Sequence, residues 1–249
     1  MSTTFWGRVQ LAAIALLTVI IVLVLVLLLL WNNRPDYWTH NRQLLASDNA
    51  TLQQLAGGLE QRTLRDLSGT PEDTSTTRTL HLSFDEVNAW INVKLEDYLA
   101  NRNIKLPRQI RHPMVAGKPG RVIVAFEYES GSVSQVMSFE LEPVFSQDRR
   151  QFQVKLRKAR AGALPLPIRT LRNQVAKQSP QAASQLDELF DAMENRWMEA
   201  VQNHPGDARM NLRLTNIVID EQGLELTLQS EPRPPKESSN PAPSTEPAS

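Results

Sequence analysis

The chain has 249 residues, its 27 Lys and Arg balance its 27 Asp and Glu, and it contains no cysteine. The lack of cysteine excludes disulfides, thiolate catalysis and cysteine-bound metals. The zero formal charge gives no overall attraction to nucleic acid, so no nucleic-acid partner is expected.

Residues 11–31 form an apolar run in which Thr18 is the only polar side chain. At about 1.5 Å per residue, a helix of this length measures ~32 Å and matches the ~30 Å hydrocarbon core of a bilayer. Trp6 and Trp31 flank the run, as aromatic residues do at membrane interfaces. No small-residue cleavage site follows the run, which disfavours a cleaved signal peptide. Residues 9–33 are therefore predicted to be a transmembrane anchor.

The charges beside this run predict its orientation. Arg8 and the N-terminal amine precede it, whereas Arg34 on the other side is offset by Asp36. Because positive charge stays on the cytoplasmic side, residues 1–8 are predicted to be a cytoplasmic tail and the rest of the chain to lie outside the cytoplasm.

Residues 34–77 are predicted to be a helical neck and linker. Asp48 or Asn49 is suited to cap a helix. The polar, turn-rich residues 69–77 favour a linker. The apolar positions of the helix recur at helical spacing: Leu52, Leu55, Ala56 and Leu59.

Residues 78–229 are predicted to be an exported α+β domain. Residues 79–82 alternate as a strand does, and Ser83 to Glu86 form a capping box that starts a helix. Its apolar stripe is expected to pack on a sheet and consists of Val87, Trp90, Ile91, Leu95, Tyr98 and Leu99.

Three strands with alternating apolar residues follow, at 121–128, 135–141 and 151–158. Turns between them predict an antiparallel meander, with a register in which Glu140 opposes Lys155. The residues expected to share one apolar face are Val122, Val124, Phe126, Tyr128, Met137, Phe139, Leu141, Phe152, Val154 and Leu156.

The rest of the chain predicts a break in the sheet, two helices, a hairpin and a tail. Residues 162–167 should break the sheet, and a closing hairpin should join 210–219 to 224–228 through Asp220 to Gly223. Residues 230–249 hold six prolines and five serines, which predicts a disordered tail. The two helices are expected near 168–177 and at about 180–203, the second with an acidic flank.

No pattern in the chain predicts catalysis. Asp85 and Glu86 are acidic neighbours that helix capping explains. The four histidines lack metal-ligand spacing, and there is no nucleophile elbow, P-loop or dinucleotide motif. We therefore assign no catalytic, cofactor-binding or metal-binding residue and expect no cofactor.

Two candidate binding surfaces remain. The first is an apolar groove between the helix and the sheet, which has the residue types of either a filled core or an acyl-chain site. Its residues are Val87, Trp90, Ile91, Leu95, Met137, Phe139, Phe152 and Val154.

The second candidate surface is basic, because residues 149–177 contain no acidic residue. Its cations are suited to anionic lipid headgroups, at about 1 kcal/mol per charge near a membrane. Pairing with Glu140, Glu142 and the acidic helix is the alternative. The cations are Lys155, Arg157, Lys158, Arg160, Arg169 and Arg172.

Three motifs give a resemblance: LSFDEVNAW at 82–90, GALPLP at 162–167 and NLxLxNIxI at 211–219. In this order behind an N-terminal anchor, they resemble the YpmS-like family of bacterial membrane-anchored proteins and, more distantly, exported domains of the tubular lipid-binding type. The resemblance implies one antiparallel curled sheet packed with helices, and a buried backbone hydrogen bond from Asn88. It also implies an interior lined by Leu82, Val87, Trp90, Ile91, Leu164 and Leu166.

The function predicted first is that of a single-pass protein of the bacterial cytoplasmic (inner) membrane whose exported domain binds lipid or another apolar ligand without catalysis. The alternative is a structural or scaffold subunit of an envelope complex, with the helix at 180–203 as the surface for a protein partner. An enzyme ranks third.

Overall fold

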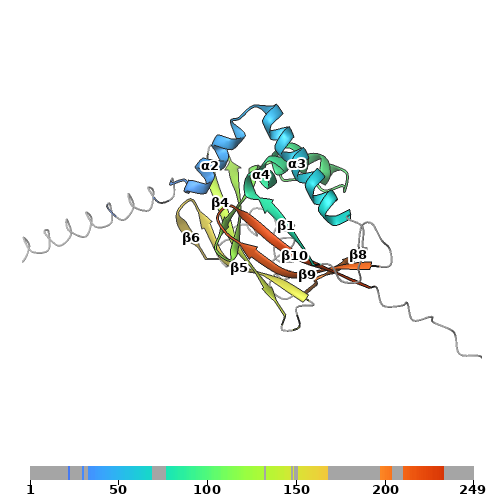
Figure 1. Ribbon diagram of the computed structural model, residues 1–249. Coiled ribbons are helices and arrows are strands. Elements are labelled where there is room, and N and C mark those ends of the chain that lie inside the picture. The colour runs from blue at the N-terminus through green and yellow to red at the C-terminus, as the bar shows by residue number, and fades with distance from the viewer. Residues whose placement is uncertain are drawn as a thin grey trace, which may run out of the picture.

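A computed structural model describes residues 33–68, 77–131, 133–146, 151–167, 197–203 and 210–232, with the single positions Val22, Leu30 and Asp148 (Figure 1). These residues form two antiparallel sheets. The four-stranded sheet holds, in spatial order, β1 (Thr77–Ser83), β10 (Gly223–Pro232), β9 (Met210–Ile219) and β8 (Val201–Asn203). The six-strand group holds β2 (Ile110–Lys118), β3 (Arg121–Ser130), β4 (Val133–Phe145), β5 (Gln151–Ala161) and β6 (Leu164–Leu166), and β7 (Met198–Glu199) pairs with β5.

Three helices lie together on one side of the described molecule in Figure 1. They are α2 (Asp36–Leu45), α3 (Asn49–Ser68) and α4 (Phe84–Ala100). None of the described helices is long and apolar enough to cross a membrane.

The predicted fold class is wrong. Instead of one curled sheet behind a membrane-spanning helix, the described residues form two separate antiparallel sheets that are not curled, with three helices that do not span a membrane. The physical reason is strand pairing. β1 pairs with the C-terminal β10 and not with the meander, so it opens a second sheet. Apart from Val22, Leu30 and Asn33, the predicted span at 9–33 lies outside the described residues.

The predicted meander is confirmed, since β3, β4 and β5 pair in sequence. Two neighbouring strands were not predicted. β2 pairs with β3, and β6 pairs with β5 where a sheet break was predicted at 162–167. Pro165 is compatible with β6 because this strand lies at the sheet edge, where a proline removes no ladder bond.

The predicted register between β4 and β5, with Glu140 opposite Lys155, is wrong. Glu140 lies opposite Lys158, and Glu142 lies opposite Lys155. The register shifts between Glu140 and Leu141, so one extra residue of β5 is accommodated there.

The closing hairpin is confirmed, and its turn joins the two sheets. The Asp220 carboxylate accepts hydrogen bonds from the backbone N–H groups of Gln222 (2.7 Å) and Gly223 (2.8 Å). These bonds lower the Asp220 pKa. The Gly120 N–H donates to the Ile219 carbonyl at 2.9 Å, which fastens the β2–β3 turn to the end of β9.

The segment predicted to be a helical neck is helical and packs on the rest of the fold. Asp48 caps α3, because its carboxylate accepts a 2.6 Å hydrogen bond from the Thr51 N–H. That bond also lowers the Asp48 pKa. α3 packs along α4. The predicted linker at 69–77 lies outside the described residues except for Thr77, which begins β1.

The start of α4 is where it was predicted, but the capping box is not formed. Ser83 occupies the N-cap position without a side-chain cap bond, and Glu86 pairs with Arg62 of α3. The Phe84 N–H donates instead to the Gln222 carbonyl at 2.9 Å. The β9–β10 turn therefore satisfies the Phe84 N–H at the start of the helix, and not the Glu86 N–H that the Ser83 hydroxyl was expected to bond.

The described C-terminal part of the predicted helix at 180–203 is not helical. Residues 198–199 and 201–203 are the strands β7 and β8, paired with β5 and β9. This pairing overrides the local helical pattern. The predicted helix at 168–177 and residues 180–196 lie outside the described residues, as does the predicted tail beyond Pro232. β10 includes the buried Ser230, so residues 230–232, which were predicted to belong to the tail, are part of a strand.

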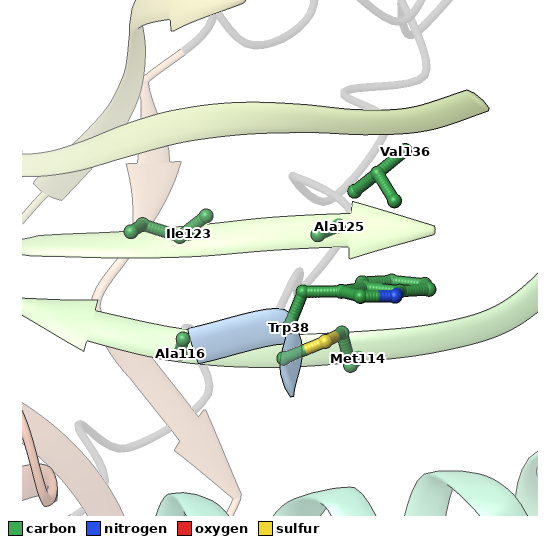
Figure 2. Close-up of a cluster of buried hydrophobic side chains, with 6 residues drawn as sticks. All are labelled: Trp38, Met114, Ala116, Ile123, Ala125 and Val136. Carbon is green, nitrogen blue, oxygen red and sulfur yellow. The ribbon is translucent and has the colours of Figure 1, made fainter. Parts of the chain in front are cut away.

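The hydrophobic core of the larger sheet lies under α2. Trp38, with 1% of its surface exposed, lies beside Met114 of β2 and against the strands that carry Ala125 and Val136 (Figure 2). Ala116 and Ile123 complete this cluster, and Tyr37 packs against it. α2 therefore buries the side of the sheet that carries Met114, Ile123 and Ala125.

Candidate functional site

The opposite side of the larger sheet carries the larger apolar side chains. The register places Val124 opposite Phe139 and Phe126 opposite Met137. The rings of Phe126 and Phe139 stack with centroids 5.9 Å apart. We call this side the apolar face. Leu156, opposite Leu141, and Ala159, opposite Phe139, are buried on it. Its half-buried members are Val122, Val124, Phe126, Met137, Phe139, Leu141, Phe152 and Val154.

The predicted groove falls into two groups of residues. Met137, Phe139, Phe152 and Val154 lie on the apolar face as predicted. Their expected partners lie on α4, which packs chiefly on α3 and β2 rather than on β4 or β5. The two groups are therefore not brought together in one groove by the described elements.

The four α4 residues of the predicted groove, Val87, Trp90, Ile91 and Leu95, are half-buried. The Trp90 indole N–H donates a 2.8 Å hydrogen bond to the Glu60 carboxylate of α3. The Trp90 ring also lies edge-on to Tyr98, with centroids 5.6 Å apart. Trp90 thus belongs to the contact between α3 and α4.

The inward side of α4 is set by a polar residue. Asn88 is 3% exposed, and its side-chain amide donates to the Val115 carbonyl (2.8 Å) while its oxygen accepts from the Val115 N–H (2.7 Å). The backbone hydrogen bond expected of Asn88 is confirmed. Because two bonds join one side chain to one backbone residue, Asn88 fixes both the position and the rotation of α4 on β2. Phe84 and Ala89 are buried beside it, whereas Leu82, Leu164 and Leu166 are half-buried.

A charged group occupies the core side of the sheet beyond Trp38. We call it the Glu140 cluster: Glu140 with Lys118, Arg121 and Arg160. Glu140 is 3% exposed, and its carboxylate lies 3.2 Å from the Lys118 ammonium, 3.3 Å from the Arg121 guanidinium and 3.2 Å from that of Arg160. Three cations surround one buried carboxylate, so the cluster keeps an excess of positive charge.

The electrostatics of Glu140 favour its ionised form. Burial raises the pKa of this carboxyl, but the hydrogen bond and charge of Lys118, with the charges of Arg160 and Lys158, outweigh burial and hold the pKa below its ordinary value of 4.5. Burial also raises the pKa of the Tyr37 hydroxyl, which contacts Ser138 beside this cluster.

The predicted basic surface is only partly described. Arg160 contacts Glu140, and Arg157 contacts Glu142. These pairs follow the alternative in which the strand cations are neutralised by Glu140 and Glu142. Lys155 is half-buried and Lys158 exposed, while Arg169 and Arg172 lie outside the described residues.

Sequence reasoning missed Lys118 and Arg121 as members of the same cluster. Both flank the β2–β3 turn, and β2 was not predicted. A usable signal exists, because residues 102–126 contain six cations and no acid. Such a stretch must find its counter-charges elsewhere in the chain.

Within the described ranges, no three His, Asp or Glu side chains gather as a metal ion would require. His40 lies 3.3 Å from Asp85 and His81 lies 3.4 Å from Glu225, in exposed pairs. Both pairs are contacts at the surface of the fold.

No protein-family model matches the chain, and no curated protein matches it in sequence. The resemblance to the YpmS-like family therefore stays a prediction.

Proposed function

We propose that this protein is a membrane-attached lipid-binding protein of the bacterial envelope that works without catalysis. The observation that carries the proposal is the group of large, half-buried apolar side chains on the apolar face of the larger sheet. Small residues such as Ala125 are fully buried under α2, whereas Phe126, Met137 and Phe139 on the other side stay half-buried. Large apolar side chains gain the most from burial, so a half-buried face of them is suited to an apolar ligand.

The proposed ligand is the acyl chain of a phospholipid. Each methylene removed from water contributes about 0.8 kcal/mol, so roughly ten methylenes on the apolar face supply ~8 kcal/mol before the cost of association. The aromatic rings of Phe126 and Phe139 offer flat apolar contacts along the strands. The Glu140 cluster lies on the other side of the sheet and takes no part in this site.

Attachment to the membrane is proposed from the sequence of residues 11–31, whose apolar character suits a bilayer interior. The proposed orientation places the N-terminus in the cytoplasm and the sheets outside it. A domain attached to the membrane lies close to the phospholipids that its apolar face is proposed to bind.

The test is native mass spectrometry of the full chain released from a mild detergent micelle. We expect a bound phospholipid on the wild-type protein and its loss in Phe139→Gln, because an amide on the apolar face must be desolvated against the acyl chain. The matched control is Val218→Gln on β9, at a side chain that is 49% exposed. Circular dichroism of each variant checks that the fold is retained. Equal lipid retention in Phe139→Gln and wild type overturns the proposal, and so does a wild-type protein that carries none.

A further inference from the structure

The loop between α4 and β2 exposes apolar and basic side chains together. We call residues 101–109 the α4–β2 loop. Ile104 is 51% exposed and Leu106 is 39% exposed, and Tyr98 on the last turn of α4 is 40% exposed. Arg102, Lys105 and Arg108 alternate with them, and no acidic residue occurs within the loop.

The conformation of the loop is set by the end of α4. The Asn103 N–H donates to the Ala100 carbonyl and the Ile104 N–H donates to the Leu99 carbonyl, at 3.0 and 2.9 Å. Asn103 has φ +58°, in the left-handed region that such a helix ending requires. In this motif the residue in the Ile104 position usually packs back on the helix, yet Ile104 stays exposed.

The loop lies at the same end of the larger sheet as the proposed membrane segment. The Glu129 N–H at the end of β3 donates to the Gln109 carbonyl at 2.9 Å, which places the loop at that end. Two residues earlier on β3, Glu127 lies 3.7 Å from the Arg34 guanidinium. At the β5–β6 turn, the Ala163 N–H donates to the Leu30 carbonyl at 2.9 Å. The chain leaving the apolar run at 11–31 therefore joins the sheet where the loop protrudes.

We propose that the α4–β2 loop docks on the surface of the bilayer that holds residues 11–31 and selects anionic phospholipid there. Ile104 and Leu106 enter the interface, and the neighbouring cations contact lipid phosphates. The inference rests on the proposed membrane attachment, and it adds a second, lipid-selective contact to it.

Charge complementarity supports this occupant. Arg102 lies over the Tyr98 ring, 4.1 Å from its centroid, and Arg111 just beyond the loop pairs with Glu129. Within the part of the chain that the structure describes, Lys105 and Arg108 form no ion pair. Both are exposed, so their charges are available to an anionic surface.

The experiment places a fluorophore at Ile104 in the full chain. Because the chain has no cysteine, Ile104→Cys gives one labelling site for an environment-sensitive dye. The matched control is Val218→Cys, since Val218 is 49% exposed and Ile104 is 51% exposed. Val218 precedes Ile219, which lies at the opposite end of β3 beside Gly120.

Each labelled protein is reconstituted into vesicles of phosphatidylcholine with phosphatidylglycerol, or of phosphatidylcholine alone. We expect blue-shifted emission at position 104, quenched by spin-labelled lipid, in the anionic vesicles, and unshifted emission at 218. Replacing Lys105 or Arg108 by glutamine should lower the ratio of docked to undocked loop about fivefold per charge.

The outcomes separate this inference from the proposed function. If the protein does not float with either vesicle, the membrane attachment itself is wrong. If it floats but positions 104 and 218 emit and are quenched alike, the loop does not dock. If docking is equal in neutral and anionic vesicles, the selection of anionic lipid is wrong.

Discussion

Removing the charge of Glu140 is the sharpest perturbation of the larger sheet. In Glu140→Gln the side chain keeps its size, but Lys118, Arg121 and Arg160 lose their shared counter-charge. These three partners are 42%, 38% and 32% exposed, so solvent screens each pair. An exposed pair contributes about 0.2–1 kcal/mol, and three pairs on one buried carboxylate give an expected loss of about 2 kcal/mol in the free energy of unfolding.

Urea unfolding of the full chain in a nonionic detergent measures this loss, with the fluorescence of the buried Trp38 contributing to the signal. For an m value of about 2 kcal/mol per molar urea, the midpoint should fall by about 1 M. Glu129→Gln is the matched control, because within the described residues the Glu129 carboxylate pairs with Arg111 alone and is 48% exposed. Its expected loss is about 0.5 kcal/mol.

The same pair of proteins should differ in pH dependence. The Glu140 pKa lies below 4.5 in the folded protein, so its contribution to stability is present above pH 4.5 and is lost as the pH falls through the lowered value. The gap between wild type and Glu140→Gln should therefore shrink on acidification. A midpoint shift no larger than that of Glu129→Gln, or a gap that grows at low pH, would refute the electrostatic reasoning.

Two further substitutions test how the elements are joined, and both are measured by urea unfolding. Asn88→Ala should cost about 3 kcal/mol, because it leaves the Val115 N–H and carbonyl unpaired in the α4–β2 contact. Asn92→Ala, which removes a single part-buried bond within α4, should cost less than 1 kcal/mol. Equal losses would contradict the role given to Asn88. Gly117→Ala should cost about 3 kcal/mol, because the added methyl would overlap the Asp220 carbonyl and the Phe84 ring where the two sheets meet. Gly57→Ala on α3, where nothing lies within 4 Å, should be neutral or slightly stabilising, and a similar result for Gly117→Ala would show that this contact yields.

Local patterns predicted most strands, because alternation and turn residues act over a few positions. The hairpin through Asp220 and the meander of β3, β4 and β5 are of this kind. The division into two sheets was not predictable in this way. It depends on β1 pairing with β10, far along the chain, and no local signal in residues 77–83 specifies that partner.

The candidate site shows the same limit. Alternation correctly grouped Phe139 with its apolar neighbours, but it did not reveal which side of the sheet α2 would cover. The side with Ala125 and Val136 is buried because Trp38 fills the space that small residues leave. On α4 the apolar stripe pointed to Trp90 as the inward residue, whereas Asn88 faces β2 because Val115 offers it a matching donor and acceptor.

The most direct test of the account is to find where a lipid acyl chain touches the protein. The full chain is reconstituted with a phospholipid that carries a photoreactive group near the end of its acyl chain, irradiated, digested and mapped by mass spectrometry. The account predicts adducts on the half-buried strands around Phe126, Met137 and Phe139 of the apolar face. Adducts restricted to residues 11–31 and the α4–β2 loop, with none on β3 or β4, would contradict it.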